Sequence, residues 1–321
     1  MRFVFTSYVF SPQFNDPQAW LNRIDFYTGI LQELAKTHTV ISIEQICYEG
    51  DYTCNGVQYL FRMFSKFERR FPFRQHRIIK NLHPDVVVVQ GLHFPAQLIQ
   101  LRNMLGGKVK IMVQNHAEQP FNGFKKLLQQ LADRRVNAYF FASACMGSKW
   151  ISRGNLASPD KIYEVMEVSS VFAPVNSKAA SSKTGITHQP AFLWVGRLNK
   201  NKDPITVVSA FLKFTVQNPA AMLYMIYQKD DLLPELKQLL EDHPAAKQHI
   251  KLIGRIPHAD LLYWYNSAGF YISGSHYEGS GAAICEAMSC GCIPVVTGID
   301  AFRMITDNGR CGILYEPGNM D

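Results

Sequence analysis

The stretch from Ser273 to Thr297 constrains the fold most, because it reads as a strand end, a glycine-rich loop, a helix, a loop and a strand. Glycines allow the loop backbone to approach a bound group closely, and they stand at Gly274, Gly279 and Gly281. Helix-forming residues begin directly behind the loop, so we expect unpaired N–H groups around Gly281, Ala282 and Ala283. Such a helix N-terminus carries a partial positive charge and favours a phosphate.

Two carboxylates flank this helix N-terminus with seven residues between them, Glu278 in the loop and Glu286 within the helix. Helical side chains lean back toward the helix N-terminus, so Glu286 should return toward the mouth that Glu278 lines. Ionised carboxylates only accept hydrogen bonds, and hydroxyl groups can donate them. An anion site beside two such acceptors fits a molecule with both phosphates and hydroxyls, and a nucleotide sugar is such a molecule.

The segment EGSGAAICEAMSCGCIPVV resembles the donor-site signature of the retaining glycosyltransferase family 4, also called glycosyl transferases group 1. A second match lies upstream in FLWVGRLNKNKDP, where Arg197 and Lys202 stand in the places of the family's diphosphate-binding arginine and lysine. The resemblance covers nearly all of the second half of the chain and the first half only loosely. It implies an α/β protein of the GT-B fold, with two Rossmann-like domains that face each other across a crevice.

By this resemblance, the chain is a hexosyltransferase-type enzyme that moves a sugar from a nucleoside diphosphate to a hydroxyl acceptor with retention. The acceptor would be a glycan or a lipid-linked molecule in polysaccharide or glycolipid assembly. A UDP-sugar is the favoured donor, with a GDP-sugar as the alternative. Arg197 and Lys202 would hold the diphosphate, Glu286 the ribose hydroxyls and Glu278 the sugar. No metal-binding Asp-x-Asp occurs in a matching place, so we expect neither a metal nor another cofactor.

Two further positions follow predicted strands. His116, in VQNHAE, matches a family histidine that contacts the donor sugar, although it could instead cap its loop. His93, in QGLHFP, is a weaker candidate of the same kind. Gly254 and Arg255 match a family contact with the nucleotide base, and a plain turn at the strand exit is the equal alternative.

Residues 59–80 combine phenylalanines with seven basic side chains. Read as one helix, the segment places Phe64, Phe67 and Phe71 on one face and most of the basic residues on the other. One interpretation is an interfacial helix for an anionic membrane surface, and the other is a surface helix whose aromatic stripe packs on the sheet. A nucleic-acid partner is not expected, because no recognised motif accompanies the charge.

Alternation of apolar strand candidates with amphipathic segments predicts a parallel α/β sheet in each half. The sequence after the first strand, SYVFSPQFND, has no glycine, which excludes the dinucleotide fingerprint and departs from the glycosyltransferase family. That departure leaves open a non-catalytic nucleotide-sugar-binding partner subunit with the same fold. An epimerase or a phosphorylase of this architecture is a third class, and nothing resembles a phosphorylase's cofactor lysine.

The 321 residues are enough for two ordinary domains. We predict an acceptor-side domain at 1–175, a linker at 176–190 and a donor-binding domain at 191–321, which we expect to be incomplete at its C-terminus. The net charge of +7 lies entirely before residue 176, where 20 Lys and Arg face 13 Asp and Glu. Seven cysteines without metal-type spacing indicate reduced thiols, so we expect a cytoplasmic protein. If the basic aromatic segment, residues 59–80, is an interfacial helix, the protein would bind peripherally to the inner face of the membrane.

Overall fold

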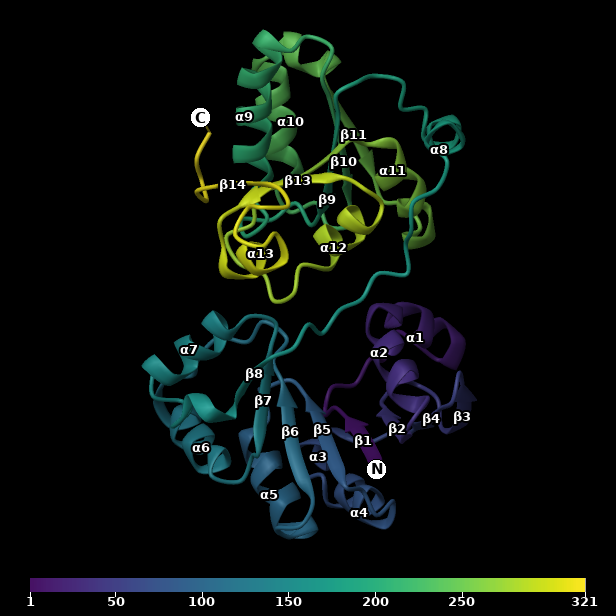
Figure 1. The fold of residues 1–321 in the computed structure, drawn as a ribbon, viewed down its shortest axis with the longest axis vertical. Coiled ribbons are helices and arrows are strands. Elements are labelled where there is room, and N and C mark those ends of the chain that lie inside the picture. Colours follow the sequence, from purple (N-terminus) through teal and green to yellow (C-terminus); the bar gives the residue numbers. More distant parts are fainter. Residues whose placement is uncertain (321) are drawn as a thin grey trace. The chain divides into compact units, whose positions relative to one another are not determined.

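The computed structural model describes residues 1–320, and for Ala245 and Ala246 it describes the backbone alone. The chain forms two compact units, Met1–Ser169 and Ser170–Asp321. Each unit is an α/β layer structure in which helices cover a mainly parallel sheet (Figure 1). Two separate Rossmann-like sheets, as predicted from the alternating pattern, are therefore present.

Unit 1 contains an eight-stranded sheet in the order β3-β4-β2-β1-β5-β6-β7-β8, in which only β3 runs antiparallel to its neighbour. Its strands are β1 (Arg2–Thr6), β2 (Thr39–Glu44), β3 (Gly50–Cys54), β4 (Val57–Phe61), β5 (Val86–Gln90), β6 (Lys110–Gln114), β7 (Ala138–Phe141) and β8 (Ile162–Glu164). Its helices are α1 (Pro17–Arg23), α2 (Asp25–Ala35), α3 (Lys66–Arg70), α4 (Phe73–Asn81), α5 (Pro95–Leu105), α6 (Gly123–Asp133) and α7 (Ala144–Ser152). The strand order reverses between β1 and β5, so the binding crevice of this unit is expected at their carboxyl ends.

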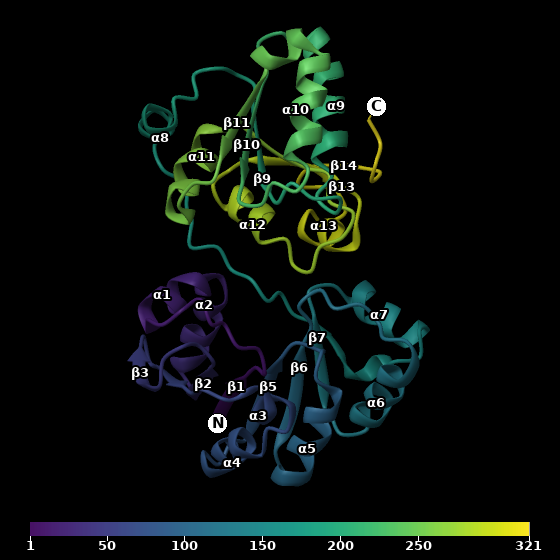
Figure 2. The same cartoon turned by 180° about the vertical axis from the view of Figure 1, so that it is seen from behind.

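Unit 2 contains a six-stranded parallel sheet in the order β11-β10-β9-β12-β13-β14. Its strands are β9 (Ala191–Gly196), β10 (Met222–Tyr227), β11 (Ile250–Gly254), β12 (Phe270–Ser273), β13 (Ile293–Thr297) and β14 (Ile313–Tyr315). Its helices are α8 (Ser177–Thr184), α9 (Pro204–Gln217), α10 (Leu233–Asp242), α11 (Leu261–Ser267), α12 (Ala282–Ser289) and α13 (Asp300–Ile305). Figure 2 shows α9 and α10 together on one side of this sheet and α11 on the other. The order reverses between β9 and β12.

The basic aromatic segment at 59–80 is not one helix, and this corrects the sequence-based expectation. Its first residues belong to β4, where Val57, Tyr59 and Phe61 are buried in alternation. The turn before β4 is Asn55-Gly56, and both residues have positive φ, as a tight two-residue hairpin requires. Pro72 then separates α3 from α4.

The packing of this segment also differs from the expectation. Phe64 is buried, whereas Phe67, Phe71 and Phe73 are exposed. The aromatic residues therefore do not form one stripe against the sheet.

The predicted linker at 176–190 contains a helix. The Asn176 side chain accepts a hydrogen bond from Ala179 N and begins α8, and Gly185 ends it in the left-handed conformation. This helix packs against α11 inside unit 2. The boundary between the two units lies before this segment, between Ser169 and Ser170.

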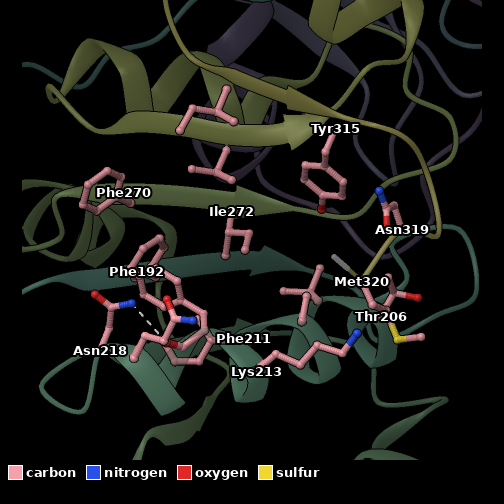
Figure 3. A pocket seen from close by; sticks show the side chains of 16 residues that line it. Phe192, Thr206, Phe211, Lys213, Asn218, Phe270, Ile272, Tyr315, Asn319 and Met320 are labelled. Carbon is pink, nitrogen blue, oxygen red and sulfur yellow. Dashed lines mark hydrogen bonds between the residues drawn. The ribbon is translucent and has the colours of Figure 1, made fainter.

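An apolar groove of about 560 Å³ lies on the unit 2 sheet beside α9 (Figure 3). Aromatic and aliphatic side chains form its walls, among them Phe192, Phe211, Phe270 and Ile272. Parallel sheets are usually covered by helices on both faces. The groove lies where this helical cover ends over β12, β13 and β14. Its lining residues differ from the donor residues predicted from the sequence. Within residues 1–320, no helix is both long enough and apolar enough to span a membrane.

Candidate functional site

The predicted strand, glycine-rich loop, helix and strand are all present. Strand β12 ends at Ser273, residues 274–281 form what we call the donor loop, and α12 begins at Ala282. Gly281 is the N-cap of α12 in the left-handed conformation, with φ of 61°, and no described side chain caps the helix there. The first N–H groups of α12 are therefore available to an acceptor outside the helix, as a phosphate site needs.

A second loop, residues 197–203, which we call the β9 loop, joins β9 to α9 and lies against the donor loop. His276 N donates to Asn201 O at 2.8 Å, and Asn201 Nδ2 donates to Tyr277 O at 2.9 Å. His276 Nε2 also lies 2.9 Å from Asp203 Oδ2. These two loops follow β9 and β12, between which the strand order reverses, and that is where open α/β sheets bind ligands.

Gly274 allows the two loops to approach this closely. A Cβ atom at this position would lie 2.8 Å from Val207 Cγ2 and 3.0 Å from Asp203 O. The second of these atoms belongs to the backbone, which cannot rotate away as a flexible side chain can. Any larger residue at position 274 would therefore push the donor loop away from the start of α9.

This approach brings Lys202 and Glu278 together. Lys202 Nζ forms an ion pair with Glu278 Oε1, and both side chains are largely buried. Ser275 Oγ donates a second hydrogen bond to Glu278 Oε1 at 2.6 Å. Arg197, the other predicted diphosphate ligand, follows β9 directly and is exposed. The site thus presents one exposed cation and one cation paired with a carboxylate.

Glu286 points inward from α12 and is nearly buried. Its Oε1 lies 2.8 Å from His258 Nε2, and its Oε2 accepts a hydrogen bond from Tyr265 Oη at 3.1 Å. The ring of Phe172 packs on His258 with 5.1 Å between the ring centroids. Sequence reasoning missed His258, because its relation to Glu286 depends on tertiary structure and the two residues are 28 positions apart.

Tyr271 indicates that the two carboxylates share one neighbourhood. Burial raises the pKa of this phenol above its usual value, and the negative charges of Glu278 and Glu286 raise it further. Both carboxylates therefore lie close enough to one buried side chain to act on it.

Gly254 and Arg255 stand at the carboxyl end of β11. Gly254 has φ of 80°, a conformation that favours glycine, and Arg255 is exposed. A turn at the strand exit therefore accounts for the glycine, and a contact with a nucleotide base stays a prediction.

His116 lies in unit 1 after β6. Its Nδ1 forms an ion pair with the buried Glu167, and its Nε2 lies 2.7 Å from Gln90 Oε1. Burial would lower the pKa of His116, but the hydrogen bond and charge of Glu167, together with the charge of Glu118, raise it above the usual histidine value. Both ring nitrogens of His116 therefore have partners within unit 1, and a contact between this histidine and a donor sugar stays a prediction.

Glu118 fixes the loop around His116. Its Oε1 accepts a hydrogen bond from Leu92 N at 3.0 Å, and its Oε2 accepts bonds from Asn115 Nδ2 and His116 N. His93 Nε2 lies 3.8 Å from Glu118 Oε1, with its side chain exposed. The structure thus places His93 at the edge of the same loop, in a weaker contact than that of His116. Among residues 1–320, no cluster of three or more His, Cys, Asp or Glu side chains could hold a metal ion.

Residues 176–321 match the sequence profile of the family described as glycosyl transferases group 1. The O-antigen chain mannosyltransferase B of Escherichia coli is 24% identical over 153 residues, which cover 46% of this chain and 39% of that protein. The alpha-monoglucosyldiacylglycerol synthase of Acholeplasma laidlawii is 26% identical over 139 residues, which cover 43% of this chain and 34% of that protein. The matched regions therefore span well under half of these relatives.

Solved structures resemble the whole chain. The glycosyltransferase of Rickettsia africae superposes with a TM-score of 0.73 at 16% identity, covering 99% of this chain and 85% of that one. The HepE protein of Anabaena in complex with UDP superposes with a TM-score of 0.72 at 15% identity, covering 100% and 87%. The fold is therefore GT-B, and residues 176–321 match the profile of the glycosyl transferases group 1 family.

Proposed function

We propose that this protein is a retaining glycosyltransferase of family 4 that moves a hexose from a nucleoside diphosphate to a hydroxyl acceptor. Unit 2 would bind the donor and unit 1 the acceptor. One observation carries the proposal: the β9 loop and the donor loop bring Lys202 and Glu278 into contact beside the uncapped N-terminus of α12. A cation and a helix N-terminus, which suit the diphosphate, then lie beside a carboxylate that can accept hydrogen bonds from the hydroxyl groups of a sugar.

The diphosphate part of the donor would bind the positive groups. Arg197, Lys202 and the N–H groups of Gly281, Ala282 and Ala283 supply fixed positive charge. During transfer, negative charge grows on the departing diphosphate, so groups already oriented toward it lower the barrier. Front-face attack, with the departing phosphate assisting the acceptor hydroxyl, is the proposed route to retention.

The diphosphate would also change the state of Glu278. When Lys202 turns to the diphosphate, Glu278 loses its ion-pair partner, and Oε1 gains a free acceptor position beside the one used by Ser275. That oxygen can then receive a hydrogen bond from a sugar hydroxyl. Donor binding would thereby free the group that orients the sugar, and Ser275 would hold the carboxylate in place meanwhile.

Glu286 keeps acceptor capacity although both of its oxygens have partners. An ionised carboxylate offers about four acceptor positions. His258 and Tyr265 use one on each oxygen, so ribose hydroxyls can use the remaining ones. Base recognition by Gly254 and Arg255, and contact between His116 and the sugar, complete the proposal.

A UDP-sugar is the favoured donor. The support is that HepE, which has the same fold, was solved in complex with UDP. A glycan or lipid-linked acceptor is favoured by the two curated relatives, one named for an O-antigen chain and one for a glucosyldiacylglycerol. A lipid-linked acceptor would require peripheral contact of the protein with a membrane.

A screen of UDP-, GDP- and ADP-sugars tests the proposal, with thermal shift for binding and release of nucleoside diphosphate for turnover. We expect a shift and slow turnover with one nucleotide class. A non-catalytic partner subunit, the second candidate, would show the shift without turnover of any donor, even with acceptor present. Proton NMR of the transferred sugar would establish retention through the anomeric configuration of the product.

A further inference from the structure

Helix α6 presents an apolar stripe to solvent. Phe124, Leu127 and Leu131 are spaced along one face of the helix, and their exposed fractions are 74%, 56% and 48%. This spacing is typical of the buried face of an amphipathic helix. Here the face with that pattern points away from the sheet of unit 1.

The inner face of α6 is polar, and specific partners hold it in place. Gln129 Nε2 lies 3.3 Å from Tyr139 Oη, and Asp133 Oδ2 accepts a hydrogen bond from Ala157 N at 3.0 Å. Lys161 Nζ pairs with Asp133 Oδ1 at 3.4 Å. Rotation of the apolar stripe into the core would break these hydrogen bonds and the ion pair. The outward orientation is therefore built into unit 1.

Basic side chains flank the stripe. Lys125 and Lys126 lie in the first turns of α6, and Arg134 follows its last residue. Lys125 Nζ lies 4.1 Å from the centroid of the Phe121 ring. The sole carboxylate within the helix sequence GFKKLLQQLAD is the buried Asp133. A second copy of this face would bring like charges together, whereas an anionic surface would be attracted by them.

We propose that α6 is an interfacial helix that inserts Phe124, Leu127 and Leu131 into an anionic lipid surface. Phenylalanine and leucine on one face with lysine beside them is the composition of helices that lie in the headgroup region. The loop of His116 leads into α6 within seven residues. Docking of α6 would therefore bring that loop to the membrane surface, where a lipid-linked acceptor is located. The purpose of docking rests on the proposed function, but the docking itself does not require it.

Co-sedimentation with vesicles at low salt tests the proposal, using the whole chain without any sugar donor. Vesicles of equal parts phosphatidylcholine and phosphatidylglycerol should bind the protein, and phosphatidylcholine alone should bind it far more weakly. The double variant Phe124→Ser with Leu127→Ser should bind the anionic vesicles about a hundredfold more weakly. Each apolar side chain that no longer inserts into the lipid is expected to lower the affinity about tenfold. Lys125→Glu should weaken binding to the anionic vesicles alone.

The matched control is Phe67→Ser with Phe71→Ser, which removes two exposed phenylalanines, Phe67 within α3 and Phe71 directly after it. This variant should bind vesicles like the unchanged protein. Because all the substituted side chains are exposed, the melting temperature should stay the same in every variant. The proposal is overturned if the α6 variant binds as well as the unchanged protein, if only the α3 variant loses binding, or if anionic lipid has no effect.

The oligomeric state separates the lipid surface from a second copy of this chain. Size-exclusion chromatography with light scattering should give the same mass for the unchanged protein and for the α6 variant. A dimer that the α6 substitutions convert to a monomer would overturn the proposal in favour of self-association. Nucleoside diphosphate binding in unit 2 is measured separately. A protein that binds the nucleotide but not the vesicles would contradict only the membrane docking. A protein that binds the vesicles but not the nucleotide would contradict only the proposed transfer activity.

Discussion

Lys202 and Glu278 lie 76 positions apart in the sequence and form an ion pair in the structure. Gly274 makes the pair possible, because a side chain at that position would collide with Val207 and with the backbone of Asp203. The two residues predicted to bind different parts of a donor therefore neutralise each other when no donor is present. In the proposed function Lys202 leaves this pair to bind the diphosphate, so we expect the two substitutions to have different effects.

We predict that Lys202→Ala weakens nucleoside diphosphate binding and that Glu278→Gln does not. The lysine variant loses a cation and leaves Glu278 as an unpaired negative charge beside the incoming phosphates. The glutamine variant frees Lys202 for the diphosphate, so binding should be equal or tighter while sugar transfer falls. Isothermal titration with UDP and a transfer assay measure the two effects. Equal loss of UDP affinity in both variants would refute this division of roles.

Arg197→Ala should lower diphosphate affinity by roughly ten- to a hundredfold, because a hydrogen bond to a charged group contributes about 1.5–3 kcal/mol. Lys200→Ala is the matched control, since Lys200 is exposed on the same β9 loop and has no predicted role. It should change the affinity little. Titration of both variants with UDP is the measurement, and equal effects of the two substitutions would remove Arg197 from the site.

Glu286→Gln should weaken binding of free UDP, whereas His258→Phe should weaken it less. The first change removes the negative charge that ribose hydroxyls would contact, and the second removes one of the partners that orient it. Because Glu286 is nearly buried and bonded to Tyr265, its substitution should also lower the melting temperature. Binding to free UDP that is unaffected by Glu286→Gln, in a protein that remains folded, would contradict the ribose assignment.

The pH dependence of unit 1 should report the pair of His116 and Glu167. The pKa of His116 is raised in the folded chain, so its contribution to the free energy of unfolding is complete below about pH 6.5, the unfolded value. That contribution is lost as the pH rises through the folded pKa. NMR titration of the His116 ring should show the raised pKa, and Glu167→Gln should lower it. Glu164→Gln, at an exposed carboxylate nearby, should leave it unchanged.

Much of the fold follows from local sequence. The strands Val86–Gln90 and Met222–Tyr227 are continuous apolar runs between polar turns, which is the pattern of buried parallel strands. Asp203 and Pro204 supply an N-cap and a first helical residue, and α9 begins there. The hairpin of β3 and β4 differs from the expectation, because the basic and aromatic residues that follow Asn55-Gly56 favour a helix although these two residues are a strong turn signal.

Other features depend on contacts that no local pattern contains. Periodicity alone would place the stripe of α6 against the sheet, but the buried partners of Gln129 and Asp133 turn it outward. His258 and Glu167 become neighbours of Glu286 and His116 only through the packing of distant segments. Motif spacing predicts that Glu278 and Glu286 bind the donor, whereas the side chains that hold these carboxylates are found only in the structure.

Titration with UDP tests most directly whether the β9 loop and the donor loop of unit 2 bind a nucleotide sugar. The unchanged protein, Arg197→Ala and Lys200→Ala are each titrated by calorimetry, with GDP and ADP as comparison nucleotides. We expect saturable binding of one nucleoside diphosphate per chain, weakened roughly ten- to a hundredfold by Arg197→Ala and little affected by Lys200→Ala. No saturable binding of any of the three nucleotides, or binding that Arg197→Ala leaves unchanged, would contradict it.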